Sequence, residues 1–265
     1  MGLFGLTVAG LLLAGTAVAQ VAPEVASEVA SLAPTGRLRA AINFGNPVLA
    51  QRVDGVPGGV PGGVSVALAT ELARRLGVPL AIVPFESAGS VTDALPRGVY
   101  DVVFLAVDPV RGLGIAFTSP YVLIEGGYAV REGSPWATVE AVDAPGVEVA
   151  VAKGSAYDLY LTRALKNATL VRFPTGNEAG AAFVAGENDV LAGVKQPLVA
   201  LVAANPGLAM VPGRFMSIEQ AMGTPKERDG AGLAYLQAFL ADMKRSGVVA
   251  KALAESGQRD AEVAP

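Results

Sequence analysis

Cysteine and histidine are both absent from the 265 residues of this chain. Without cysteine the chain can form no disulfide bond and offers no thiolate nucleophile. Without histidine it lacks the usual proton shuttle of the Ser-His-Asp hydrolases, and zinc and copper lose their commonest ligands. We therefore expect no metal, no cofactor and no catalytic residues of these classes.

Charge is also sparse, since charged residues make up 17% of the chain and the net charge is −4. No run of lysine or arginine is present, which excludes a typical nucleic-acid surface, because such surfaces depend on clustered cations. Apolar residues make up 52%. The chain can therefore build substantial cores, and its length suits one large domain or two small ones.

One pattern, Gly-x-x-Asp followed by two apolar residues, occurs at 98–103 and again at 186–191. Each copy follows a segment with strand character and one with helix character, at 78–84 and 87–95 for the first copy and at 168–174 and 175–185 for the second. Two similar α/β halves predict two lobes that face each other. A cleft between lobes is a common place to hold a small molecule.

In the rest of the chain, segments with the periodicity of a strand also alternate with segments that have the periodicity of a helix. The leucines of 65–76 recur every four residues and Gly77 follows them, which predicts an amphipathic helix. Further strands are expected at 38–42, 102–107 and 147–152, and further helices at 157–166, 231–243 and 248–254. This alternation favours a mostly parallel sheet. We expect the chain to cross between the lobes at 124–130 and at 216–223.

The first 19 residues are uncharged and end in Ala17-Val-Ala19. This is typical of a signal peptide cleaved after Ala19, although the usual basic residues are missing before the apolar stretch. An uncleaved membrane anchor is the alternative interpretation. Residues 20–35 read as a loose N-terminal arm with a short helix. We expect an exported protein, located in the periplasm where the cell has an outer membrane.

Two segments carry a resemblance to a known family. Gly-Val-Ser-Val-Ala-Leu-Ala-Thr-Glu-Leu-Ala-Arg-Arg-Leu-Gly at 63–77 and Arg-Gly-Leu-Gly-Ile-Ala-Phe-Thr-Ser-Pro-Tyr at 111–121 resemble signatures of bacterial extracellular solute-binding proteins of family 3. These are the amino-acid-type periplasmic binding proteins of ABC importers. The similarity covers roughly residues 36–256.

The resemblance implies an α/β fold of the periplasmic-binding-protein type II, with two lobes, a two-strand hinge and closure around one ligand. Lobe 1 would comprise 36–126 and 222–265, and lobe 2 would comprise 127–221. It also implies that Arg111 holds the carboxylate of the ligand. A planar guanidinium suits that task because it can donate two parallel hydrogen bonds.

The matching element of the second lobe is Gly154, Ser155, Ala156 and Tyr157, at the start of a predicted helix. Free N–H groups at a helix N-terminus favour an anion. Ser155 could instead only cap the helix, with Asp158 completing a capping box. Tyr157 could reach the ligand or simply form a wall of the cleft.

The first ligand loop of the family matches Asn43, Phe44 and Asn46, which could bind the ligand or form a turn of their own. The chain departs from the family after the second Gly-x-x-Asp strand, where 193–196 contain no carboxylate to hold an ammonium group. Either Asp108 or Glu125 replaces that anion, or the ligand has no ammonium. In the second case Lys195 would suit a second carboxylate or another acceptor. Each of these three side chains could also serve only a turn, the hinge or the solvent.

These features predict a binding protein, not an enzyme. Its partners would be a small carboxylate-bearing ligand, either an amino acid or an organic acid, and an ABC permease in the inner membrane. We expect a monomer. The alternatives are an enzyme similar to cyclohexadienyl dehydratases, which would use a carboxylic acid in the cleft, and a ligand-sensing partner of a membrane receptor.

Overall fold

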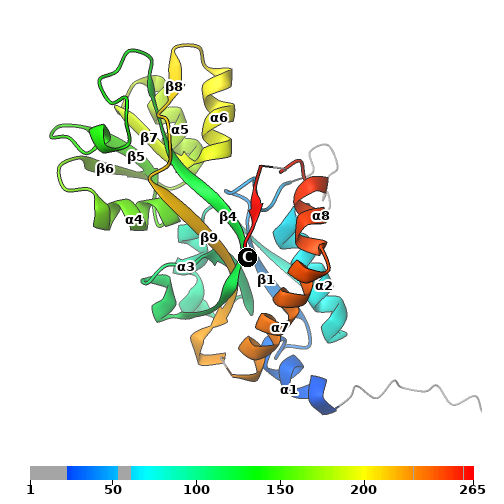
Figure 1. Cartoon of the computed structure of the whole chain (residues 1–265). Helices are drawn as coiled ribbons and strands as arrows, with labels where there is room; N and C mark the ends of the chain where they lie inside the picture. Colours follow the sequence, from blue (N-terminus) through cyan, green and yellow to red (C-terminus); the bar gives the residue numbers. More distant parts are fainter. Residues whose placement is uncertain (1–22, 53–60, 229, 259) are drawn as a thin grey trace, which may run out of the picture.

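The computed structural model describes residues 23–52, 61–228, 230–258 and 260–265, so the predicted signal peptide lies outside the described residues (Figure 1). The strands are β1 Leu38–Asn43, β2 Leu80–Phe85, β3 Val102–Ala106, β4 Ile115–Arg131, β5 Glu148–Ala152, β6 Thr169–Phe173, β7 Val190–Val194, β8 Leu208–Met210, β9 Met216–Pro225 and β10 Glu262–Val263. The α-helices are α1 Pro23–Leu32, α2 Val64–Leu76, α3 Ala88–Asp93, α4 Ala156–Ala164, α5 Gly176–Ala185, α6 Lys195–Ala204, α7 Ala231–Arg245 and α8 Val248–Glu255. The helices and strands predicted from periodicity are all present, with bounds shifted by a few residues.

The strand order shows that the two halves have the same topology. The sheet runs β2-β1-β3-β9-β4-β7-β5-β6. In the first lobe β2, β1 and β3 are parallel and β9 is antiparallel to them. In the second lobe β6, β5 and β7 are parallel and β4 is antiparallel. The internal repeat seen in the sequence is therefore a repeat of structure.

The aspartates of the two Gly-x-x-Asp copies make the same pair of hydrogen bonds to backbone. Asp101 accepts a hydrogen bond from the backbone N–H of Arg39 at 3.0 Å, and its own N–H donates to the carbonyl of Arg39. Asp189 accepts from the backbone N–H of Glu148 at 2.9 Å and donates to the carbonyl of that residue. The glycine that begins each copy has a positive φ, 59° and 90°. Each copy thus turns the chain and ties the next strand to the first strand of its own half.

Two long strands join the lobes. Figure 1 shows β4 and β9 running side by side from one lobe to the other. β4 pairs with β9 over 115–126 and then with β7 over 126–130. Both predicted crossings, at 124–130 and 216–223, fall within these strands. The exact residue limits given above for the two lobes remain predictions.

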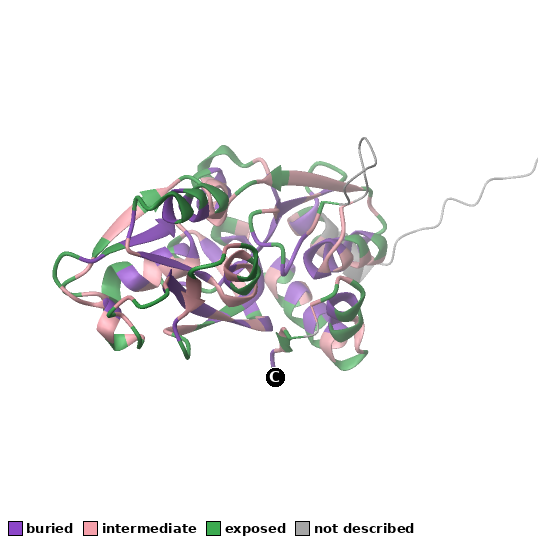
Figure 2. Cartoon of the chain, turned by 90° about the horizontal axis from the view of Figure 1, so that it is seen from above, coloured by how far each residue is buried: buried purple, intermediate pink, exposed green. Residues whose placement is uncertain are grey.

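Each lobe has its own apolar cores (Figure 2). In the first lobe Leu68, Leu72 and Leu76 of α2 are buried, as their four-residue spacing predicts. The cores of the second lobe lie on the two faces of its strands, around Val149 and Val151 on one face and around Phe183 on the other. Separate cores allow the lobes to move as units about β4 and β9.

The part of the N-terminal arm that the structure describes packs on the first lobe. Its helix α1 packs against α7, and Leu32 is fully buried in the first lobe. Ser31 Oγ also donates a hydrogen bond to the carbonyl of Arg228. Among the residues that the structure describes, no helix has the length and apolar character needed to cross a membrane.

Candidate ligand site

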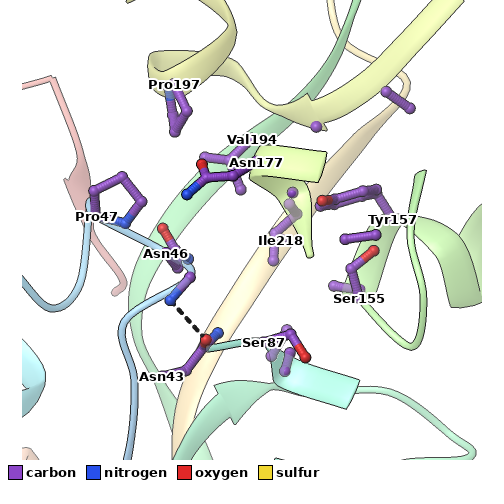
Figure 3. A pocket seen from close by; sticks show the side chains of 18 of the residues that line it. Asn43, Asn46, Pro47, Ser87, Ser155, Tyr157, Asn177, Val194, Pro197 and Ile218 are labelled. Atoms are coloured by element: carbon purple, nitrogen blue, oxygen red, sulfur yellow. Dashed lines mark hydrogen bonds between the residues drawn. The ribbon is translucent and has the colours of Figure 1, made fainter. Parts of the chain in front are cut away.

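A cavity of about 320 Å³ lies between the two lobes. Its walls come from the loops and helix starts that follow β1, β2, β5 and β6, and from the ends of β3 and β7 (Figure 3). The carboxyl ends of parallel strands meet at one edge of a sheet, which is where open α/β sheets bind ligands. Because the two half-sheets face each other across the cleft, both contribute such an edge to this cavity.

Arg111 lines the cavity and is 2% exposed. One guanidinium nitrogen donates to the carbonyl of Ala106 at 2.9 Å, and the other donates to the carbonyl of Gly154 at 2.8 Å. Its buried Nε has no hydrogen-bond partner. Burial lowers the pKa of Arg111 to about 10, with Asp108 opposing the shift, so the side chain keeps its charge at neutral pH. Within the described residues no carboxylate forms an ion pair with this charge.

The N-terminus of α4 faces Arg111 from the second lobe. Ser155 is the N-cap, and its Oγ accepts a hydrogen bond from the N–H of Asp158 at 3.0 Å. The carboxylate of Asp158 accepts from the N–H of Gly154, one residue earlier than the predicted capping box requires. Ala156 and Tyr157 line the cavity at the start of the helix. Backbone N–H groups at this position have no intrahelical acceptor and suit an anion.

The lobes touch each other beside the cavity. A Cβ placed on Gly89 of α3 would lie 2.4 Å from the carbonyl oxygen of Lys153, and one on Gly154 would lie 2.8 Å from the Cα of Gly89. Gly154 also has a φ of +69°. The side chains of Asp108 and Arg163 form a second bridge between the lobes, at 2.8 Å. The structure is therefore that of lobes in contact, as a closed binding protein requires.

The predicted first ligand loop contributes its two asparagines. Asn43 and Asn46 line the cavity (Figure 3). Phe44, between them, does not line it; its ring packs on the core of the first lobe and lies under the guanidinium of Arg52 at 4.3 Å. β1 ends at Asn43 and the chain turns at Phe44 and Gly45, and this turn brings Asn43 and Asn46 to the cavity while the ring of Phe44 packs on the core.

The structure places four other predicted site residues outside the cavity wall. Asp108 accepts hydrogen bonds from Val110 N–H and Arg163, so it serves a turn and the bridge between lobes. Gly154 contributes its carbonyl to Arg111 instead of a surface to the cavity. Glu125 and Lys195 pair with each other at 2.5 Å in a separate pocket beside the hinge.

Sequence reasoning missed much of the remaining wall. The polar members are Glu86, Ser87, Asn177 and Gln220, and the larger apolar members are Pro47, Leu105, Leu191, Val194, Pro197, Leu198, Leu201 and Ile218. Glu86 and Ser87 follow β2 directly and Asn177 lies in the first turn of α5 after β6, so the rule for carboxyl ends of parallel strands could have found them. Gln220 and Ile218 lie on the hinge strand β9, and no local sequence signal marks them.

The family model for bacterial extracellular solute-binding proteins, family 3, matches residues 54–256. A mutant of ArgBP from T. maritima is 25% identical, with a TM-score of 0.74 over 87% of this chain and 99% of that one. AbpA from Streptococcus pneumoniae, an amino acid ABC transporter substrate-binding protein bound to L-arginine, is 22% identical, with a TM-score of 0.73 over 86% and 98% of the two chains. No curated protein sequence matches the chain.

A third solved structure is that of the ancestral amino acid-binding protein AncCDT-1, a precursor of cyclohexadienyl dehydratase. It is 24% identical, with a TM-score of 0.70 over 86% of this chain and 97% of that one. These likenesses confirm the predicted fold, in which two α/β lobes of the periplasmic-binding-protein type II are joined by two strands. By the extent of the family match, the chain belongs to the bacterial extracellular solute-binding proteins, family 3.

Proposed function

We propose that this protein captures a small carboxylate-bearing solute in the cleft between its lobes and delivers it to an ABC importer of the inner membrane. It would act in the periplasm as a monomer, after removal of residues 1–19. Capture would proceed by closure of the lobes about β4 and β9, which are the strands that join them.

The observation that carries this proposal is the charge of Arg111. A buried cation without an anionic partner is costly, because burial removes its hydration. Arg111 nevertheless lines the cavity without an anionic partner among the described residues, and it faces the N-terminus of α4. A ligand carboxylate placed between them would receive charge-assisted hydrogen bonds from one lobe and helix N–H groups from the other. Such a ligand would stabilise the closed arrangement by joining its two sides.

The carboxyl groups of the cavity favour binding over catalysis. An enzyme of the dehydratase type on this fold would need a carboxylic acid in the cleft for proton transfer. Among the described lining residues Glu86 is the only carboxylic acid, its side chain is 65% exposed, and it forms an ion pair with Arg52. An exposed and paired carboxylate is poorly placed to act as a general acid, because such a role needs burial or like charges to raise its pKa.

Isothermal titration calorimetry tests the proposal. The purified mature protein is titrated with amino acids and with small monocarboxylates and dicarboxylates, and its folded state is verified by circular dichroism. Saturable heat from at least one carboxylate, lost in Arg111→Ala, is the expected result. If a folded protein gives no heat with any of these compounds, the proposal fails.

A further inference from the structure

The charged groups of the cavity restrict the ligand. Arg111 and Glu86 are the only charged side chains among the described lining residues. Glu86 is largely solvated and already paired with Arg52, so it marks the rim of the cavity and not its interior. The interior therefore offers a ligand one buried cation and no buried anion.

The asparagines of the first loop contribute neutral amides whose N–H donors are unused. Asn43 Oδ1 accepts a hydrogen bond from the N–H of Gly45 at 3.0 Å (Figure 3). Asn46 Oδ1 accepts from the N–H of Val48 at 3.3 Å. Local backbone therefore engages one lone pair of each carbonyl oxygen, whereas neither NH₂ group donates a hydrogen bond to the described residues. The remaining amide side chains of the wall, Asn177 and Gln220, are neutral.

The part of the cavity wall formed by β7 and α6 of the second lobe is apolar. It is built by the end of β7 and the start of α6, which contribute Leu191, Val194, Pro197, Leu198 and Leu201. Leu191 and Leu198 belong to a core of the second lobe, so this side of the cavity is continuous with a hydrophobic interior. Such a wall favours an apolar ligand body, because burying apolar surface there is stabilising.

From this arrangement of one buried guanidinium, unused N–H donors and an apolar wall, we infer that the ligand is a small monocarboxylate with an apolar body and without an ammonium group. The inference rests on the proposed function and narrows it. An ammonium has three donors and no acceptor, and in this cavity it would find neutral amide and hydroxyl oxygens but no buried carboxylate among the described lining side chains, with Arg111 as a like charge. A second carboxylate has no second buried cation, since Lys195 is paired with Glu125 outside the cavity.

Matched pairs of compounds that differ only in the ammonium group test the inference directly. The pairs are 4-methylpentanoate with L-leucine and 3-phenylpropanoate with L-phenylalanine, and L-arginine and succinate are titrated beside them. We expect the desamino compound of at least one pair to bind at least about tenfold more tightly than its amino acid, because the buried ammonium is unpaired. L-arginine and succinate should bind more weakly than that compound.

A variant that adds an anion to the wall should reverse the preference. Val194 lines the cavity and is the N-cap of α6, with no side-chain cap hydrogen bond. Asp and Asn are both favourable N-cap residues, so Val194→Asp and Val194→Asn should both fold. Because the two variants are nearly isosteric, the difference between them isolates the charge. In Val194→Asp the affinity for the amino acid, relative to that for its desamino partner, should rise about tenfold over the wild-type ratio. In Val194→Asn this ratio should not change.

The outcomes separate the two proposals. If an amino acid binds the wild-type protein as tightly as its desamino partner, or more tightly, the inference is overturned while the proposed function stands. Tighter binding of L-arginine or succinate than of either desamino compound overturns it in the same way. If none of the compounds binds to folded protein, the inference fails together with the proposed function.

Discussion

The guanidinium of Arg111 donates a hydrogen bond of 2.8 Å to the carbonyl oxygen of Gly154 across the cleft. Arg111 belongs to the first lobe and Gly154 to the second, so the bond forms only when the lobes meet. The same guanidinium lines the cavity, and no carboxylate of the described residues forms an ion pair with it. One side chain therefore links lobe closure to the recognition of an anion.

Removing Arg111 should abolish most of the binding. We expect Arg111→Ala to lose about 2–5 kcal/mol of binding free energy for the tightest-binding monocarboxylate, the usual cost of truncating one partner of a buried charged pair. Arg111→Lys should recover only part of this, because an ammonium cannot donate two parallel hydrogen bonds. Calorimetry measures both losses. Arg97→Ala is the control because Arg97 is exposed outside the cavity, and near-wild-type affinity of Arg111→Ala would move the site elsewhere.

Adding a single methyl group at Gly89 should hold the lobes apart. The new Cβ would lie 2.4 Å from the backbone oxygen of Lys153, a contact that forces the backbone of one lobe away from the other. Small-angle X-ray scattering with saturating ligand should give a larger radius of gyration for Gly89→Ala than for the wild type, and its affinity should fall.

Gly112→Ala is the matched control, because a Cβ there meets nothing within 4 Å. It should leave both the scattering profile and the affinity unchanged. Equal scattering of ligand-bound Gly89→Ala and wild type would show that the contact does not limit closure.

The ion pair of Asp108 and Arg163 should stabilise the closed form slightly. The Arg163 side chain is 46% exposed, so solvent screens the pair, and we expect a coupling of about 0.5–1 kcal/mol in ligand binding. A double-mutant cycle with Asp108→Asn and Arg163→Ala measures it, and the coupling should shrink as salt is added. Additive effects of the two substitutions would mean that the bridge plays no part in closure.

The two aspartates of the internal repeat should differ in their contribution to stability. Asp101 is fully buried and forms ion pairs with Arg39 and Arg228. Asp101→Ala leaves two cations without their partner, and we expect a loss of about 3–5 kcal/mol in unfolding free energy. Asp189→Ala removes one hydrogen bond to the N–H of Glu148 and should cost about 1 kcal/mol. Urea unfolding compares the two, and equal losses would contradict this account.

The fold could be predicted from the sequence because its signals are local and repeated. The leucine spacing of α2 marks one helix, and the two Gly-x-x-Asp copies mark equivalent turns in the two halves. N-caps such as Ser155 and Thr175 fix the helix starts. The position of α1 could not be predicted from the sequence. It depends on packing against α7, which lies about two hundred residues later in the chain.

The binding site could be predicted only where the chemistry of a residue or a helix end favours binding an anion. Arg111 and the start of α4 lie on the cavity as expected. The charged residues proposed to hold an ammonium do not, because each finds a partner from another part of the chain. Asp108 pairs with Arg163 and Glu125 with Lys195, over separations of 55 and 70 residues. Such pairings depend on how the lobes and hinge are assembled, which residue spacing does not report.

Alkaline pH should unfold the protein through its buried tyrosines. Burial raises the pKa of Tyr100, Tyr121 and Tyr128, so above pH 10 the unfolded chain releases protons that the folded chain keeps. Stability therefore falls as pH rises, by about 1.4 kcal/mol per pH unit for each tyrosine. Arg111 has the opposite effect on stability. Because its pKa is lowered, the folded chain loses this proton above pH about 10 while the unfolded chain keeps it, which favours the folded chain as pH rises.

Burial also raises the pKa of Tyr157 and Tyr235, so the tyrosines outweigh Arg111 and we expect a net fall in stability that steepens between pH 10 and 11 as the tyrosines of the unfolded chain ionise. Urea unfolding between pH 8 and 11 measures this slope. Tyr121→Phe removes one of these titrating groups and the hydrogen bond between Tyr121 and Ser65, so it should cost about 1 kcal/mol at pH 7 while making the alkaline slope shallower by about 1.4 kcal/mol per pH unit. An unchanged slope in that variant would show that Tyr121 ionises as freely in the folded protein as in the unfolded chain.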